Sequence, residues 1–491
     1  MVRMESTVSG NSARDEYPDR DGAVRTSAFS VGATAAFSDE DALEALRHLL
    51  RIPTISRPAH GPGPRTDSAP FEQFIAALPG LFPRVHAALE LERVGDNGQG
   101  SGHALLYRWR GTDRAAATQP TVLMAHYDVV PATDDGWQHP PFAAEIVGEG
   151  DDAVLWGRGT LDDKGCVVAI LSAVERLLST GHTPQRDVLL CFGNDEEVFG
   201  TGARGIVDVL RERSIRPSLV LDEGGAIVRE IFPGVDEDYA VIGVTEKGIT
   251  TLRLRVDEHG GHAASPPAFA ATERLSRAIL RLSRRPSRAR LGTTTRTMIR
   301  TLGSRARQPL RAVFGAVDLL APLLTRVFVS RGAETAALTR TTRAVTELRA
   351  GHAPNALAES AEATLNMRIA PWSSVDEAVD EVRRAIGDDA VQIEVVEASE
   401  PSPVSPDRGP AWDDLVAAVR TVHPGLLVAP YVMMQASDAR WFTAISDHVY
   451  RFAPFRMSGE ERACLHAKNE RMRVTAFLDG VEVYRALLER R

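Results

Sequence analysis

Cysteine is scarce in this chain, and long apolar runs are absent. Only three cysteines occur among 491 residues, at Cys166, Cys191 and Cys464, and none belongs to a Cys-x-x-Cys pair. This spacing excludes a disulfide framework and a thiolate zinc site, so we expect the three thiols to be buried as small apolar side chains. No stretch approaches the roughly 18 consecutive apolar residues of a membrane-spanning helix.

An excess of positive charge is also lacking. The formal net charge is -9, and the 57 Lys and Arg residues are scattered along the chain, which argues against a nucleic-acid partner. Residues 1–37 are polar, mixed in charge and without the apolar segment of a secretory signal. We therefore expect a flexible N-terminal tail over residues 1–37 and a cytoplasmic protein.

Strand and helix patterns alternate over residues 38–246. A helix is predicted to begin after Ser38, an N-cap residue that precedes three acidic residues. Short apolar runs and a helical pattern follow at 121–125, 165–180, 187–192 and 218–221. Such alternation predicts an α/β fold with a mostly parallel sheet and helices on both faces. Residues 401–491 are predicted to complete this larger domain.

A smaller domain is predicted to interrupt the larger one at 247–400. Its order of strand, helix, two strands, helix and strand matches a ferredoxin-like α+β unit. An additional insertion at about 285–343 contains the apolar run 313–329, which is interrupted by Asp318, Pro322 and Arg326. This run is too broken to span a bilayer.

Candidate catalytic groups follow several predicted strands. His126 and Asp128 come directly after the strand at 121–125, where open α/β sheets place their sites. Acidic pairs stand at Asp162-Asp163, Glu196-Glu197 and Asp222-Glu223, and a further histidine, His466, lies near the C-terminus. Crowded carboxylates repel one another unless a cation separates them. Two imidazoles with several carboxylates and no thiolate suit zinc or a similar metal ion.

These segments resemble the dinuclear zinc peptidases that include aminoacylase, carboxypeptidase S and glutamate carboxypeptidase. The likeness covers about residues 40–488 and is strongest to the branch of carboxypeptidase S and the N-fatty-acyl-amino-acid synthase/hydrolase. It rests on HYDVVP at 126–131, GW at 136–137, PPF at 140–142, GRGTLDDK at 157–164, DEE at 195–197 and DEGG at 222–225. The resemblance implies that the larger domain is catalytic and that the inserted domain is a lid and dimerisation domain of a homodimer.

The resemblance also implies two Zn²⁺ ions per subunit, with Co²⁺ or Mn²⁺ as possible substitutes. The implied ligands are His126 and Asp222 for one ion, Glu197 and His466 for the other, and Asp162 for both. Asp128 is expected to hydrogen-bond to His126 and fix its tautomer. Glu196 is expected to be the general base that takes a proton from a water bridging the two ions.

A second set of residues is implied to bind substrate. His262, in the segment GHAASP at 261–266, resembles a histidine that reaches into the partner's site and stabilises the oxyanion. Asn355, Arg368 and Arg440 resemble substrate-binding residues of the same family. An arginine fork pairs well with a free carboxylate.

The expected activity is hydrolysis of the amide bond of an N-acyl amino acid or a short peptide with a free carboxylate. The alternative hydrolase is a carboxypeptidase that acts on dipeptides. A catalytically silent metal-dependent binding protein is a third possibility, which the retained Glu196 argues against. The apolar insertion around Phe314, Leu319, Leu320, Leu323 and Leu324 either lines a pocket for a long acyl chain or packs against the domain core.

Overall fold

The computed structural model describes residues 36–58, 64–95 and 102–491. The predicted flexible tail falls almost entirely within residues 1–35, outside the described residues. Helix α1 (Asp39–Leu50) begins after Ser38, as predicted. The Asp41 N–H donates to the Ser38 hydroxyl at 3.1 Å, and the Ser38 N–H donates to the Asp41 carboxylate at 2.8 Å. This capping box satisfies amide groups that a helix start otherwise leaves unpaired.

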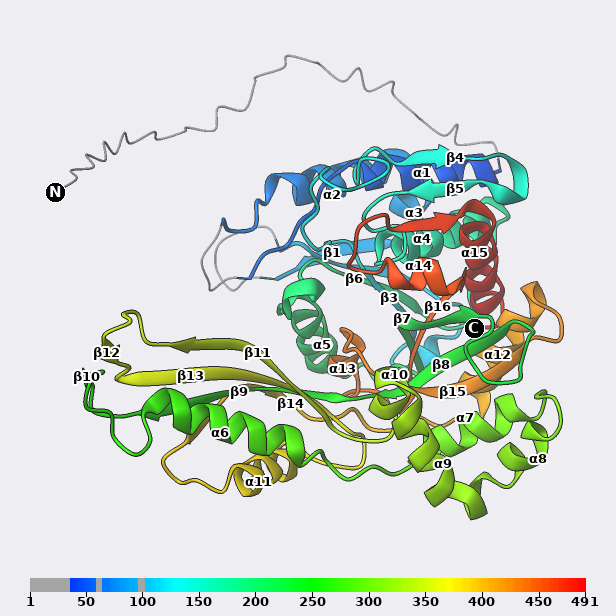
Figure 1. Cartoon of the computed structure of the whole chain (residues 1–491). Coiled ribbons are helices and arrows are strands. Elements are labelled where there is room, and N and C mark those ends of the chain that lie inside the picture. The colour runs from blue at the N-terminus through cyan, green and yellow to red at the C-terminus, as the bar shows by residue number, and fades with distance from the viewer. Residues whose placement is uncertain (1–35, 59–63, 96–101) are drawn as a thin grey trace.

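An eight-stranded sheet forms the centre of the larger domain (Figure 1). From edge to edge its strands are β1 (Glu90–Val94), β2 (Ala104–Trp109), β6 (Val188–Gly193), β3 (Thr121–His126), β7 (Leu219–Val228), β16 (Val449–Met457), β8 (Tyr239–Glu246) and β15 (Leu427–Met433). The central strands β6, β3, β7 and β16 pair in parallel, and β15 pairs in parallel with β8. The prediction of a mostly parallel sheet is confirmed.

Helices cover both faces of this sheet. One core contains side chains of α1, α2 (Ala69–Leu81), α3 (Pro83–Ala88), α4 (Lys164–Ser179), α12 (Pro410–Val422) and α15 (Val474–Leu488). The other contains side chains of α5 (Gly202–Glu212) and α13 (Ala439–Phe442). Leu123 belongs to the first core and its neighbour Val122 to the second, because successive side chains of a strand point to opposite faces. Burial on both faces explains the unbroken apolar runs of these strands.

A small three-stranded sheet lies beside the larger one. Its strands are β4 (Glu145–Val147), β5 (Val154–Trp156) and β17 (Arg471–Arg473), with β5 in the middle. Strand β17 follows His466 in the chain, and β5 precedes Asp162. Their antiparallel pairing therefore brings the C-terminal segment alongside the loop that carries Asp162.

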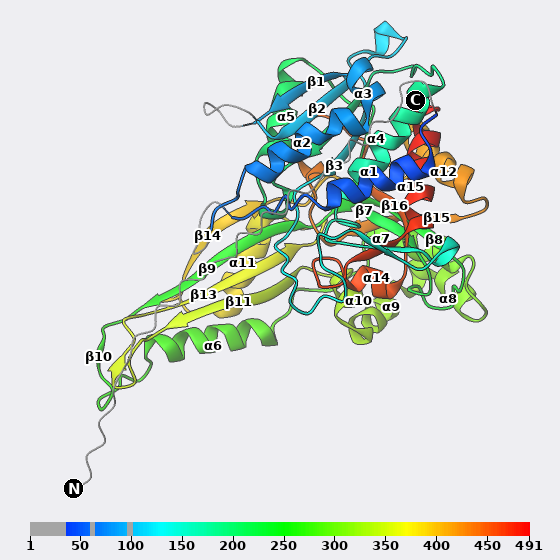
Figure 2. The same cartoon turned by 90° about the horizontal axis from the view of Figure 1, so that it is seen from above.

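The inserted domain has a sheet and a core of its own. The sheet has the order β11 (Thr342–Ala350), β13 (Ser360–Ile369), β9 (Gly248–Asp257) and β14 (Gln392–Ser399). Helices α6 (Ala271–Arg284) and α11 (Val375–Ile386) pack on one face of it. The predicted α+β domain is confirmed, and Figures 1 and 2 show it extending away from the larger domain. At its far end, β10 (Gly261–His262) pairs with β12 (Ala356–Leu357).

Four helices form the additional insertion: α7 (Thr293–Gly303), α8 (Leu310–Gly315), α9 (Val317–Arg331) and α10 (Ala333–Ala337). Helix α7 packs against β15. Phe314 and Leu324 are buried in the main core, and the Phe314 ring lies 5.0 Å from that of Phe232. Leu319 and Leu323 instead face outward. Within the described part of the chain, no helix combines the length and the apolar character that crossing a bilayer requires.

Candidate active site

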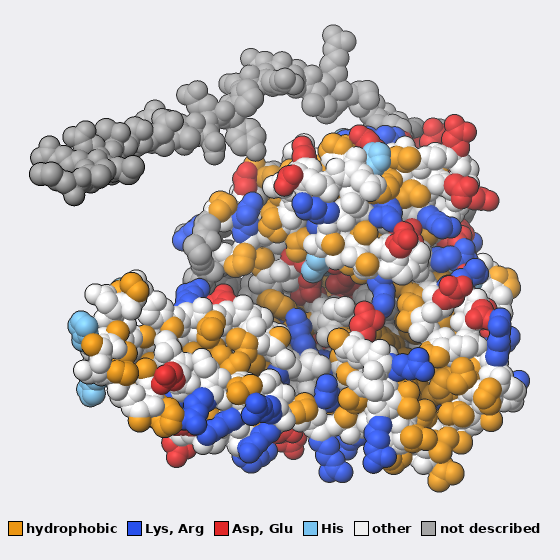
Figure 3. Space-filling model, viewed as in Figure 1, with side chains coloured by type: hydrophobic (Ala, Val, Ile, Leu, Met, Phe, Trp, Pro, Cys, Tyr) orange, Lys and Arg blue, Asp and Glu red, His pale blue; other side chains and the backbone are white. Residues whose placement is uncertain are grey.

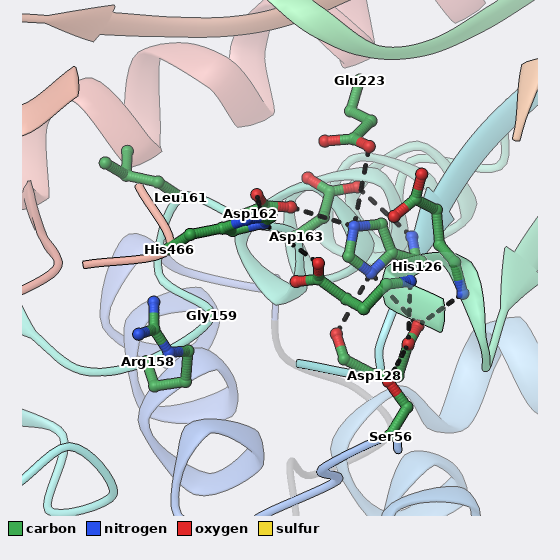
Figure 4. Close-up of polar contacts among 12 residues, drawn as sticks. Ser56, His126, Asp128, Arg158, Gly159, Leu161, Asp162, Asp163, Glu223 and His466 are labelled. Atoms are coloured by element: carbon green, nitrogen blue, oxygen red, sulfur yellow. Dashed lines mark hydrogen bonds and ion pairs between the residues drawn. The ribbon is translucent and has the colours of Figure 1, made fainter. Parts of the chain in front are cut away.

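Histidines and acids from several separate segments converge at the carboxyl ends of the central parallel strands. His126 is the last residue of β3, Glu197 follows β6 in a short 3-10 turn, and Glu223 lies within β7. Asp162 lies in the loop before α4, and His466 lies between α14 (Gly459–Ala463) and β17. Figure 4 shows Asp162 between the two imidazoles. The crevice at this edge of an α/β sheet is the usual place for a site.

Two groups of side chains have the geometry to hold a metal ion, and they share Asp162. The first is His126, Asp162 and Glu223, and the second is Asp162, Glu197 and His466. His126 Nε2 lies 3.0 Å from Asp162 Oδ1 and 3.6 Å from Glu223 Oε1. His466 Nε2 lies 3.0 Å from Asp162 Oδ2 and 3.0 Å from Glu197 Oε2. Each oxygen of Asp162 therefore serves a different group, as a bridging carboxylate does.

Electrostatics make a cation at this position favourable. Burial alone disfavours charge on Asp162, yet contacts with His126 and His466 lower the pKa of Asp162. Contacts with Asp162 and Glu197 raise the pKa of His466 to about 10. Burial raises the pKa of Glu223 well above its usual value, and the nearby Asp162 raises it further. The site thus holds more negative charge than its surroundings neutralise.

The donor set also fits a metal ion such as zinc. Glu197 Oε1 is buried and has no hydrogen-bond partner among the described residues. A buried carboxylate oxygen without a partner is costly, and a cation removes that cost. Imidazole nitrogens and carboxylate oxygens are common zinc ligands. The residues of both groups therefore fit divalent metal ions.

The structure places the neighbour of Asp222, rather than Asp222 itself, in the first possible metal-binding group. Glu223, not Asp222, stands beside His126 and Asp162. Asp222 Oδ2 accepts a hydrogen bond from the Ala439 N–H at 2.7 Å. Adjacent side chains of a strand point to opposite faces, so Asp222 and Glu223 make different contacts. Leu221 belongs to the same core as α4, whereas Val220 packs with Ala439.

Asp128 contacts both the imidazole of His126 and the turn after β6. His126 Nδ1 lies 3.1 Å from the Asp128 carbonyl oxygen and 3.2 Å from its carboxylate. The Asp128 carboxylate also accepts the backbone N–H groups of Glu196 and Glu197, each at 3.2 Å, and the Ser56 hydroxyl at 2.7 Å. Asp128 thus fixes one imidazole and the two glutamates at once.

Glu196 is buried next to both groups. Burial raises the pKa of the Glu196 carboxyl well above its usual value; His126 opposes this, and Asp438 and Asp162 add to it. Glu196 belongs to neither possible metal-binding group. A carboxylate in this position is free to exchange a proton with a reacting molecule.

Glu470 is a buried acid that the sequence analysis missed. Its Oε1 accepts the N–H groups of Leu161 at 2.8 Å, Gly159 at 3.1 Å and Asp162 at 3.2 Å. Its Oε2 pairs with Arg158, which donates to the Ala467 carbonyl at 2.9 Å. The pair therefore ties the Asp162 loop to the residue after His466. No local sequence pattern reveals this link, since it joins segments about three hundred residues apart.

Cations line the side of the site that faces the inserted domain. Arg368 on β13 lies within electrostatic range of Arg440 and Glu196; burial and then Arg440 lower the pKa of Arg368. Lys247, also missed from the sequence, is buried, and burial together with Arg368 and Arg340 lowers the pKa of Lys247 to about 8. Neighbouring cations repel one another, and a bound anion between them relieves that repulsion.

His262 and Asn355 lie elsewhere. His262 is exposed in β10 at the far tip of the inserted domain (Figure 1), and the adjacent Ala263 N–H donates to the Asn355 carbonyl at 3.1 Å. The structure thus brings these two residues together, but away from the metal-binding groups of their own chain. Of the four predicted substrate residues, Arg368 lies within electrostatic range of both Glu196 and Arg440.

Known proteins are similar in sequence to this chain over most of its length. The family model of peptidase family M20/M25/M40 matches residues 122–490. Probable carboxypeptidase S-like 2 of Dictyostelium discoideum is 33% identical over 461 residues, covering 92% of this chain and 86% of that protein. The N-fatty-acyl-amino acid synthase/hydrolase PM20D1 of Homo sapiens is 33% identical over 462 residues, covering 92% and 89%.

Solved structures share the fold at low sequence identity. The M20 family metallo-carboxypeptidase Sso-CP2 of Sulfolobus solfataricus has a TM-score of 0.65 at 16% identity, covering 91% of this chain and 98% of that one. Human carnosine dipeptidase 1 has a TM-score of 0.61 at 14% identity, covering 92% and 97%. The family model and the two relatives at 33% identity show that this chain belongs to peptidase family M20/M25/M40 and is a metallohydrolase.

Proposed function

We propose that the protein hydrolyses the amide bond of N-acyl amino acids that carry a free carboxylate. The observation that carries the proposal is the pair of possible metal-binding groups that share Asp162, with the buried Glu196 beside them. Relatives named N-fatty-acyl-amino acid synthase/hydrolase support this substrate class.

The proposed metal is zinc, two ions per subunit, with Co²⁺ or Mn²⁺ as substitutes. His126 and Glu223 would hold one ion, Glu197 and His466 the other, and Asp162 both. When bound, such ions lower the pKa of a water molecule and polarise the carbonyl group to be cleaved. The donor set and the unpartnered Glu197 Oε1 support this assignment.

Glu196 is the proposed general base. Its carboxylate takes a proton from the attacking water and later returns it to the leaving nitrogen of the amide. Asp128 supports this role because it holds the Glu196 N–H and thereby fixes the backbone of the turn. Burial keeps bulk water from competing for the proton.

Arg368 and Arg440 are proposed to bind the substrate carboxylate, with Lys247 as a further cation behind Arg368. A planar guanidinium binds a carboxylate through two parallel hydrogen bonds. This requirement for a free carboxylate would separate N-acyl amino acids from simple amides.

His262 and Asn355 are proposed to act in the site of a second subunit of a homodimer. Their position at the far tip of the inserted domain supports this, because they lie far from the metal-binding groups of their own chain. The inserted domain would then serve as lid and dimerisation domain, and an imidazole from the partner would stabilise the oxyanion.

The substrate class can be tested with purified, zinc-loaded protein and a matched panel of leucine, phenylalanine and glutamate derivatives. Each amino acid is supplied as its N-acetyl form, its N-oleoyl form and a dipeptide, and kcat/KM is compared. Faster cleavage of the acyl forms supports the proposal. Methyl esters of the same substrates serve as controls, since they lack the carboxylate that Arg368 and Arg440 would bind.

A carboxypeptidase that cleaves dipeptides is the second candidate. It is favoured by the likeness to carboxypeptidase S of Saccharomyces cerevisiae, which is 29% identical over 488 residues. Higher kcat/KM on dipeptides would select this activity. Zinc binding without turnover of any substrate in the panel would leave only a metal-dependent binding protein.

A further inference from the structure

Helix α9 exposes a row of apolar side chains to solvent. Leu319, Leu323 and Val327 are 82%, 54% and 38% exposed. They are spaced four residues apart and therefore share one face of the helix. We call these three residues the apolar α9 face. Hydrophobic side chains gather in the region of α8 and α9 in Figure 3.

The opposite face of α9 is firmly packed. Val317 and Leu324 are buried in the main core, and Leu320 and Phe328 pack against it. The helix therefore has apolar residues on two sides, only one of which the fold covers. Exposed apolar patches of this kind commonly mark interaction sites.

The helices around this face are strongly basic, although the whole chain is acidic. The segment 293–337, which spans helices α7–α10, contains seven arginines, no lysine and two acids. It therefore carries five positive charges in excess, while the chain has a net charge of -9. The seven arginines are Arg296, Arg300, Arg305, Arg307, Arg311, Arg326 and Arg331. The basic residues are thus locally concentrated here, a departure from the scattering expected from the whole sequence.

Three of these arginines are free to bind an external anion. Asp318 pairs with Arg296 and Arg300. Arg305 and Arg307 pair with Glu237 and Asp236, which lie in the loop between β7 and β8. Arg311, Arg326 and Arg331 have no ion pair with any described residue. At 3.6 residues per turn, Arg326 and Arg331 fall on either side of the apolar α9 face.

We propose that the apolar α9 face docks onto an anionic lipid surface. Leucine and valine side chains would enter the boundary between headgroups and acyl chains, and the arginines beside them would bind the phosphate groups. Because positive charge is concentrated around this face while the whole chain is negatively charged, the face favours a negatively charged lipid surface over a neutral one. This docking is independent of the proposed hydrolase activity.

The test is sedimentation of the full chain with two kinds of vesicle, one of phosphatidylcholine and one of phosphatidylcholine mixed with phosphatidylglycerol. We expect binding to the mixed vesicles only, and weaker binding at high salt. Leu319→Ser with Leu323→Ser should reduce the partition coefficient about tenfold or more. Arg326→Gln with Arg331→Gln should reduce it about 25-fold, since each arginine near an anionic surface contributes about a fivefold gain.

The matched control is Leu348→Ser with Arg349→Gln. Leu348 is 62% exposed and the Arg349 side chain is 75% exposed, both on β11 at the edge of the other sheet. This variant should bind vesicles like the unchanged protein, and thermal unfolding should show that all variants are folded. Equal vesicle binding by every variant would overturn the proposal, as would no binding to either vesicle. So would a dimer that dissociates in the Leu319 and Leu323 variant, since a second copy would then cover the face.

Discussion

Asp222 and Ala439 are joined by a hydrogen bond of 2.7 Å, with the Ala439 N–H as donor and Asp222 Oδ2 as acceptor. Ala439 immediately precedes Arg440, so this bond ties β7 to the segment that presents the arginine. Glu246 holds the same segment from the other side, where its carboxylate accepts the Ser437 N–H at 3.2 Å. One position along β7 therefore separates a positioning residue from a candidate metal ligand, Glu223.

This arrangement predicts that substitutions of these two neighbouring acids affect different properties, zinc content for one and substrate binding for the other. Glu223→Gln should lower the zinc content of the purified protein toward one ion per chain, because the first group loses its charged oxygen. Asp222→Asn should leave the zinc content unchanged and raise KM several-fold, because Arg440 is less well positioned. Elemental analysis with steady-state kinetics distinguishes them, and zinc loss in Asp222→Asn alone would restore the original assignment.

Substitution of the proposed general base should separate chemistry from metal binding. Glu196→Gln is expected to lower kcat by about 10² to 10⁴, since that is the usual contribution of a general base. The zinc content should stay unchanged because Glu196 belongs to neither metal-binding group. Glu212→Gln, an exposed glutamate on α5, is the control. An active Glu196→Gln protein would exclude the proposed role.

Much of the fold was predictable because local patterns determine it. Ser38 with three acids marks a helix start, and the unbroken apolar runs mark strands buried on both faces. The order of elements in 247–400 likewise follows periodicity. The candidate site was predictable where its residues follow strand ends, as His126 and Glu197 do.

The rest depends on tertiary contacts that no local pattern contains. Glu223 could be chosen over Asp222 only by knowing which face of β7 meets His126. Glu470 and Lys247 act through partners far away in the sequence. The apolar insertion was ambiguous because α9 is apolar on both sides: Leu324 packs in the core while Leu319 does not. An acyl-chain pocket and a core-packing segment would both be rich in leucine and valine, so the composition of the insertion could not distinguish them.

Glu470 is predicted to stabilise the second metal-binding group. Glu470→Gln removes the charge that holds three backbone N–H groups of the Asp162 loop and leaves Arg158 buried without its partner. Breaking a buried ion pair costs on the order of 3 kcal/mol, so the thermal unfolding midpoint should fall. A lower concentration of chelator should also be enough to remove zinc from this variant than from the unchanged protein.

The control for that experiment is Glu460→Gln, since the Glu460 side chain is 87% exposed and lies in α14 before His466. It should leave both measurements unchanged. A Glu470→Gln protein that unfolds earlier but holds zinc as tightly as before would show that Glu470 supports the fold alone. Glu470→Asp tests whether the negative charge, at a shorter reach, restores part of the zinc affinity.

The proposed dimer predicts complementation between two inactive variants. His262→Ala removes the imidazole given to the partner, and Glu196→Ala removes the base of a subunit's own site. In a mixed dimer, the Glu196→Ala subunit supplies His262 to the site of the other subunit, which keeps Glu196. Mixing should therefore restore activity in up to about half of the sites of each mixed dimer. No recovery after proven subunit exchange would show that His262 does not act in the site of the other subunit.

Metal binding should release protons from the imidazoles. Without metal, contacts with Asp162 and Glu197 raise the pKa of His466 to about 10, so His466 is protonated near neutral pH. An imidazole binds a metal ion only in its neutral form, and binding therefore displaces that proton. It follows that zinc affinity should rise as the pH rises toward the pKa of His466.

Titration calorimetry in two buffers of different ionisation enthalpy measures the protons released, and His466→Ala should release fewer. An equal heat in both buffers would show that His466 is already neutral in the metal-free protein, and the contacts with Asp162 and Glu197 would then be weaker than their 3.0 Å distances imply.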